Sequence, residues 1–181
     1  MPNAINLRLE SEREGIDPDS FLGSIRNFLA ILRNLDSALS HDSRGSIYWE
    51  IGNIHRGSPT VIAIVGESHR SDVDFTSDVQ DLCIKGLRQL DEIAERPTDY
   101  SDATLNKVKN LASYLKPGRK RRLESIEVYS DEESNYPAHV RLSHRLTANI
   151  TGLLETRYDS LGSVVGNLDS VTIHAGTEFR V

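Results

Sequence analysis

The sequence contains little cysteine and no long apolar run, and each shortage excludes a class of protein. A single cysteine, Cys83, among 181 residues cannot form a disulfide framework within the chain and suits a reducing compartment. No apolar run approaches the length that crosses a bilayer, and no basic-then-apolar start marks a signal peptide. These absences favour a cytoplasmic bacterial protein with no membrane partner.

The remaining composition is that of a polar globular protein. Hydrophobic residues make up 38% and charged residues 27% of the chain. A length of 181 residues is enough for one well-buried core, or for one core plus a small appended module. The formal net charge of −6 argues against general affinity for nucleic acid, although a local basic patch can override the global sign.

The spacing of apolar residues predicts an α+β protein with the element order β-α-β-β-α-α-β-α and a mostly antiparallel sheet packed by helices. The sequence 17–20, Asp-Pro-Asp-Ser, is typical of a helix start. Gly86 lies within an expected helix, where it predicts close packing. The expected strands are 5–9, 46–54, 61–65 and 123–130, and the expected helices are 18–39, 73–94, 101–115 and 142–154.

The C-terminal sequence predicts a separate β segment. We expect an α+β domain over 1–158 and a hairpin over 159–181 that starts a small, barrel-like β module. An isolated two-stranded hairpin is marginal in water, and an unpaired edge invites association. We therefore expect a dimer, or a chain that is truncated within this module. The β-forming residues that need cover are Val164, Val171, Ile173, Phe179 and Val181.

The segment after the third expected strand contains the best candidates for catalysis. The sequence 66–69, Gly-Glu-Ser-His, resembles a nucleophile elbow, but Arg70 occupies the position where that motif needs a second glycine. His69, Asp72 and Asp74 provide one imidazole and two carboxylates, which a metal-dependent hydrolase could use. The simpler interpretation is that the two aspartates cap the following helix.

Other reactive residue types fit structural positions. Cys83 lies on the apolar stripe of an expected helix, which indicates core packing. His139 and His144 are five residues apart, a spacing that does not align them on one helix face, and we interpret them as ordinary polar residues. The sequence contains no phosphate-binding loop. It therefore predicts no catalytic residue, metal site or cofactor.

One basic segment is the best candidate binding surface. Five cations within seven residues favour electrostatic binding to phosphates or to an acidic protein. Tyr114 is the one ring nearby, so base stacking is not indicated. The alternatives are a solvated turn that complements a helix dipole, or pairing with the acidic turn 131–133. The five cations are Lys116, Arg119, Lys120, Arg121 and Arg122.

Several short motifs together resemble a group of bacterial conserved hypothetical proteins with no established activity. They are Asn-Leu-Arg-Leu at 6–9, Arg-Gly-Ser-Pro at 56–59, Tyr-Ser-Asp at 100–102, and Gly-Ser-Val-Val-Gly-Asn-Leu at 162–168 with His174 and Phe179. The resemblance implies that the terminal β segment opens a small barrel that continues beyond this chain. It implies no catalytic or binding residue.

These observations favour a non-enzymatic interaction or adaptor module that binds a protein partner or a second copy of itself. A nucleic-acid-binding protein that uses the basic segment is the first alternative. A metal-dependent hydrolase that uses His69, Asp72 and Asp74 is the second.

Overall fold

A computed structural model describes residues 4–11, 15–69, 73–115, 123–130, 139–155, 170–174 and 176–180. The structure confirms the α+β class and the predicted element order, and it adds a short strand, β5, before the last helix. In chain order the elements are β1 (Ala4–Ser11), α1 (Pro18–Ser40), β2 (Ile47–His55), β3 (Thr60–Ser68), α2 (Thr76–Glu92), α3 (Asp102–Ala112), the 3-10 helix η1 (Ser113–Leu115), β4 (Leu123–Ser130), β5 (His139–Arg141), α4 (Leu146–Glu155), β6 (Ser170–His174) and β7 (Gly176–Arg180).

Five strands form one antiparallel sheet in the order β2-β3-β1-β4-β5. The central strand β1 lies between β3 and β4, with Leu7 opposite Ile62 on one side and opposite Val128 on the other. Because successive side chains of a strand point to opposite faces, this register places Leu7, Ile62 and Val128 on the same face.

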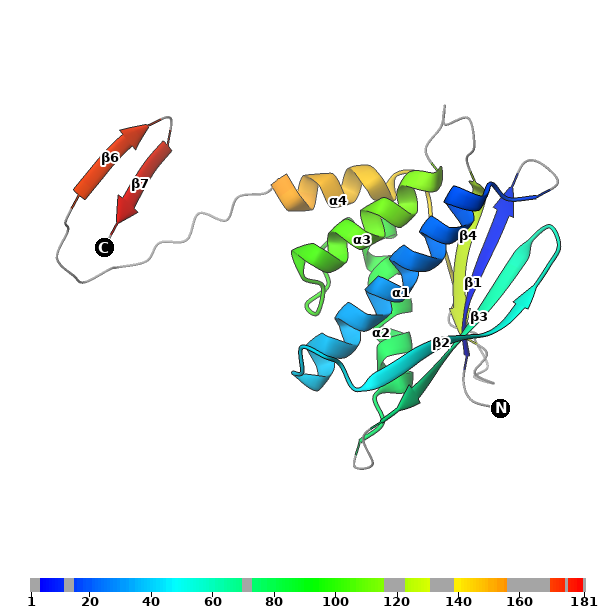
Figure 1. Cartoon of the computed structure of the whole chain (residues 1–181). Helices are drawn as coiled ribbons and strands as arrows, with labels where there is room; N and C mark the ends of the chain where they lie inside the picture. Colours follow the sequence, from blue (N-terminus) through cyan, green and yellow to red (C-terminus); the bar gives the residue numbers. More distant parts are fainter. Residues whose placement is uncertain are drawn as a thin grey trace.

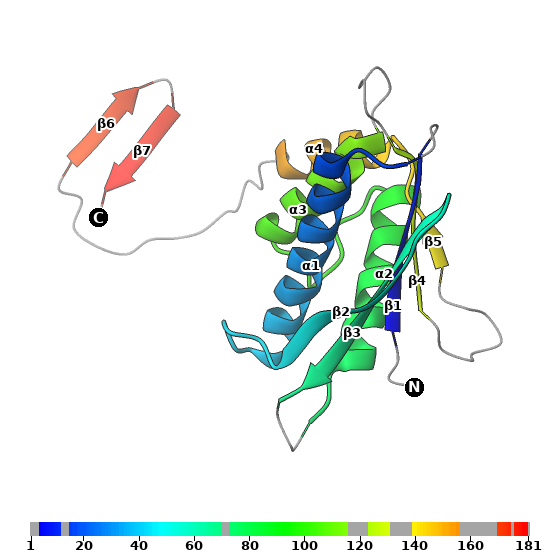
Figure 2. The same cartoon turned by 45° about the vertical axis from the view of Figure 1, so that its right-hand side comes forward.

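All four α-helices lie on that apolar face, as both views show (Figures 1 and 2). Helices α1 and α2 contact the strands, whereas α3 packs on α1 and α4. The opposite face of the sheet is free of helices within the described residues, and we call it the open face. In the described part of the chain, no helix combines the length and apolar character that a bilayer span requires.

Polar bonds fix both ends of α1, and those near its end are buried. At the start, the Asp17 carboxylate accepts the Ser20 amide at 3.1 Å, as the capping motif predicts. Near the end, the buried carboxylate of Asp36 accepts the Ser46 amide and hydroxyl at 2.9 and 2.8 Å and the Ile47 amide at 3.0 Å. Asp36 therefore holds the start of β2 against α1.

Close packing at Gly86 confirms the expectation from the sequence. A side chain at Gly86 would collide with the ring of Tyr100, which lies against α2. The Tyr100 hydroxyl donates to the carbonyl oxygen of Cys83 at 3.0 Å. Burial, followed by the neighbouring Cys83 and Asp99, raises the pKa of Tyr100 well above its ordinary value.

Two predicted boundaries are wrong. Residues 66–68 belong to β3 and do not form a loop, since they pair with β2 as far as Ile47 opposite Ser68. Gly66 permits this pairing, because a side chain there would lie 2.9 Å from atoms of Ile47, Trp49 and Thr76. The last helix starts at Leu146, not at 142, because the Leu142 amide donates to the Ile126 carbonyl and continues the sheet.

The C-terminal strands β6 and β7 form an antiparallel hairpin, with Val171 opposite Phe179 and His174 opposite Gly176 (Figure 1). This confirms that the C-terminal segment forms a hairpin. The two strands form a two-stranded sheet of their own, so the expected barrel-like module is not closed within the described residues. The predicted boundary between 1–158 and 159–181 stays a prediction.

Candidate functional site

The structure gives the proposed hydrolase residues separate surroundings. The Asp74 carboxylate accepts the Thr76 hydroxyl at 2.6 Å and the Thr76 amide at 2.9 Å, and these bonds lower its pKa. Asp74 therefore stabilises the start of α2, as the simpler interpretation predicts. The exposed ring of His69 lies 5.3 Å from the ring of Tyr48, edge to face. Asp72 lies outside the described residues.

Two further predictions concern metal binding and Cys83. Within the part of the chain that the structure describes, no three His, Cys, Asp or Glu side chains are grouped for a metal ion. Cys83 is fully buried on α2, and burial raises the pKa of its thiol far above the ordinary value. Cys83 therefore belongs to the core, as its position on the apolar stripe predicts.

The basic segment lies outside the described residues. It follows η1 in the chain and precedes β4. The interpretation that it binds phosphates or an acidic partner therefore stays a prediction, and so do its two alternatives. The residues concerned are Lys116, Arg119, Lys120, Arg121 and Arg122.

The open face carries a cluster of charges that sequence reasoning missed. Its centre is Glu127 on β4, whose side chain is 10% exposed. Glu127 Oε2 accepts from Arg8 Nη1 at 3.0 Å and lies 3.5 Å from His139 Nε2. Glu127 Oε1 lies 3.8 Å from Arg141 Nε. Three strands thus bring three basic side chains around one carboxylate, which we call the Glu127 cluster.

A pocket of about 440 Å³ lies beside the Glu127 cluster. The rings of Tyr129 and His139, with centroids 6.4 Å apart, form part of its wall. The pocket therefore combines charged groups with apolar and aromatic surface, which is typical of ligand sites. Its lining residues are Arg8, Pro59, Val61, Glu127, Tyr129 and His139.

Sequence distance explains why no local pattern predicts the Glu127 cluster. Arg8 and Glu127 are 119 residues apart, and they meet only because β1 and β4 are neighbours in the sheet. His139 and Arg141 lie on a strand of three residues, which is too short for an alternation signal. One signal in the sequence points to the cluster. Arg8 and Glu127 each occupy a polar position in a strand where apolar and polar residues alternate.

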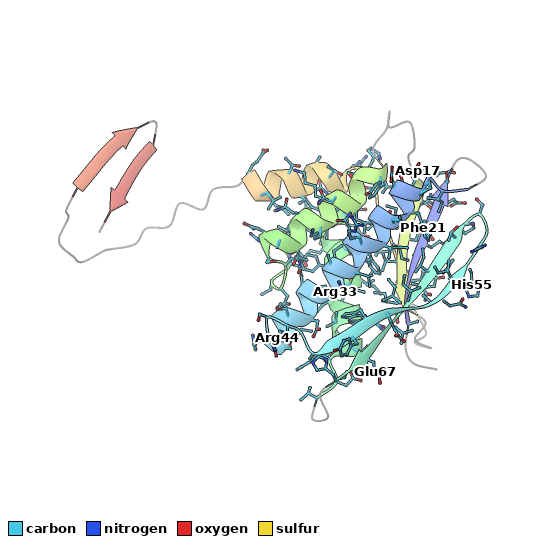
Figure 3. The ribbon with its side chains drawn as sticks, in the orientation of Figure 1. Asp17, Phe21, Arg33, Arg44, His55 and Glu67 are labelled. Carbon is cyan, nitrogen blue, oxygen red and sulfur yellow. The ribbon has the colours of Figure 1, made fainter. Side chains whose placement is uncertain are left out.

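The other edge of the sheet exposes apolar surface. Strand β2 pairs with β3 on one side and, within the described residues, has no strand on the other. Its exposed large side chains are Tyr48, at 72% exposure, Ile51, at 43%, and Ile54, at 39%. Figure 3 labels His55 on β2 and Glu67 on β3, which lie at opposite ends of this hairpin. Exposed edges of this kind are templates for a further strand.

We compared the chain with protein-family models, with curated proteins and with solved structures, and found no match in any of the three. We therefore infer function from the fold and from the geometry of the sheet alone.

Proposed function

We propose that this protein is an interaction module that binds a partner and does not catalyse a reaction. The partner is a second copy of the chain, and the two copies pair through their β2 strands into one continuous sheet. The observation that carries the proposal is the exposed outer edge of β2, which includes Tyr48, Ile51 and Ile54.

The composition of β2 supports pairing with another strand. The strand has nine residues, contains no lysine, arginine or proline, and has Glu50 as its one carboxylate. Edge strands that resist association are short or contain such residues. A bulge at Gly52, between Ile51 and Asn53, interrupts the regular edge at one place and leaves pairing possible on both sides of it.

The register of β2 supports a second copy as the partner. A two-fold axis at Ile51, with Gly52 kept in the bulge, sets Ile51 opposite its own copy and Trp49 opposite Ile54. On the open face the same axis sets Glu50 opposite Asn53 and Tyr48 opposite His55. Each pair keeps to one face of the sheet, as the β2–β3 register requires, and no two like charges are opposed.

Analytical ultracentrifugation over a range of protein concentrations tests the proposal. We expect a monomer–dimer equilibrium. The substitution Ile51→Lys places two ammonium groups opposite each other at the axis, and we expect it to weaken the dimer by about tenfold or more. Leu22→Lys is the matched control, because Leu22 is 57% exposed on α1 and lies outside β2. We expect this variant to dimerise normally.

Two substitutions at Asn53 test the register itself. Asn53→Lys introduces a cation opposite Glu50 of the second copy and is expected to tighten the dimer by about twofold, whereas Asn53→Glu opposes two carboxylates and weakens it by a similar factor. A monomer at every concentration would overturn the proposal. A dimer that Ile51→Lys leaves unchanged would show that the copies associate elsewhere.

A further inference from the structure

We propose that the pocket beside the Glu127 cluster binds a small molecule with an anionic head group attached to an aromatic body. This site lies on the open face and has no lining residue from β2, so its binding can be tested separately from the proposed dimer. The head group, a carboxylate or a phosphate, is recognised by Arg8 and His139, and the aromatic body is recognised by Tyr129 and Val61.

The charges of the cluster favour an anion over a cation. The carboxylate of Glu127 already faces Arg8 and His139 at one oxygen and Arg141 at the other. A ligand cation would have to compete with these three groups for one carboxylate. A ligand anion in the pocket meets the Arg8 guanidinium group and the His139 imidazole, while Arg141 faces the other oxygen of Glu127. Glu10, the neighbouring acid, accepts the Ser125 hydroxyl at 3.1 Å.

The Arg8 guanidinium group has N–H donors that Glu127 does not use. A guanidinium group has five N–H donors, and Arg8 Nη1 gives one of them to Glu127. Arg8 Nε is buried and has no hydrogen-bond partner among the described residues, which is costly in a folded protein. The Arg8 side chain is 35% exposed and lines the pocket, so a ligand oxygen can reach the guanidinium group.

The remaining wall of the pocket fits a flat apolar body. Pro59 and Val61 provide aliphatic surface from the β2–β3 turn and β3, and the Tyr129 and His139 rings are inclined at 49° to one another. Aromatic rings pack favourably in tilted or offset arrangements. A volume of about 440 Å³ is in the range of small-molecule sites.

Calorimetric titration with phenylacetate, phenyl phosphate and the neutral phenylacetamide tests this assignment. We expect both anions to bind and phenylacetamide to bind about tenfold more weakly or not at all, because it lacks the charge-assisted bonds. Tighter binding of phenyl phosphate would identify a phosphate ester as the head group, and tighter binding of phenylacetate a carboxylate. Equal binding of all three compounds, or binding of none, would overturn the proposal.

Two variants locate the site. Arg8→Gln removes the proposed cation and is expected to weaken phenylacetate binding by about tenfold or more. Val61→Trp keeps every charge and fills the apolar part of the pocket, so we expect a similar loss. Arg33→Gln, at an exposed arginine on α1 (Figure 3), is the control and should bind as the parent does. Circular dichroism establishes that each variant is folded, and unchanged binding in folded Arg8→Gln would refute the assignment.

Discussion

The two edge strands of the five-stranded sheet, β2 and β5, differ in length, charge and support. Strand β2 has nine residues and one charged side chain, Glu50, apart from the terminal His55. Strand β5 has three residues, of which His139 and Arg141 face Glu127. The Arg88 side chain from α2 also donates to the His139 carbonyl oxygen at 2.8 Å. One edge is thus short, charged and fixed from both sides, and the other is long and apolar.

This difference shows how one sheet can separate two binding modes. A short charged edge resists pairing with another strand and leaves its side chains for a small ligand. A long apolar edge exposes backbone groups that a second strand can satisfy. The contacts that hold each edge strand differ: Asp36 binds the start of β2, and Glu127 faces the side chains of β5. Single substitutions can remove these contacts one at a time.

The largest effect is expected from Asp36→Ala, which removes the support of β2. The buried Ser46 and Ile47 amides then lose their acceptor, at a cost of about 3 kcal/mol in the free energy of unfolding. Urea denaturation measures the loss, and hydrogen exchange should show faster opening of β2 than of β4. Asp81→Ala removes an exposed pair with Lys85 and is the control, expected to cost less than about 0.5 kcal/mol. Equal losses in both variants would contradict this role of Asp36.

A smaller loss is expected from Glu127→Gln, which removes the charge at the centre of the β5 edge. Arg8 and Arg141 then face a neutral amide, and we expect a loss of about 1–2 kcal/mol because both cations remain partly hydrated. High salt should reduce the difference from the parent. Glu124→Gln, at an exposed position of the same strand, should have almost no effect on urea denaturation. If the two variants were equally stable, the cluster would have no role in stability.

Asp74→Ala removes the bonds that hold the start of α2, shortly after the end of β3. Loss of the bonds to Thr76 should cost about 1 kcal/mol at neutral pH. Because the folded protein lowers the pKa of Asp74 below the ordinary value of 3.8, this contribution is complete above that value. It is lost as the pH falls through the lower, folded pKa. Thermal denaturation of both proteins between pH 7 and pH 2 should show the difference shrinking in acid, and a constant difference would contradict the assignment.

Substitutions in the basic segment are expected to change binding at the two edges of the sheet least of all. Replacement of Arg119, Lys120, Arg121 and Arg122 by alanine should weaken any binding of duplex DNA at low salt, and parent binding should fall steeply as salt is added. Fluorescence titration at two salt concentrations measures both effects. Affinity that survives the replacement, or no binding at low salt, would remove the nucleic-acid alternative and leave the two edges as the binding surfaces.

Local signals predicted most of the fold. The cap at Asp17 and the apolar periodicity that follows it predicted α1, and alternation predicted β4 with its observed bounds. The short strand β5 and the start of α4 depend on pairing with β4, which no local pattern reveals. In the sequence, Asp36 likewise looks like an ordinary polar residue of a helix. Its role depends on the bond from the Ser46 amide, ten positions away across the turn.

The candidate sites were harder to predict than the fold. The residues that sequence spacing grouped, His69 and Asp74, have separate partners in the structure. The residues that form the Glu127 cluster come from three strands and have no common motif. Spacing along the chain reports neighbours within one element, whereas this cluster is created by sheet topology.

The position of Trp49 makes the apolar edge visible by spectroscopy. It is the one tryptophan of the chain, it lies on β2 with 7% exposure, and Gly66 leaves room for its ring. Emission from this indole therefore reports on the surroundings of β2 at the apolar edge. Partial detachment of the edge strand would shift the emission to longer wavelengths while the helical circular dichroism stayed constant, so local opening and global unfolding can be separated in an unlabelled protein.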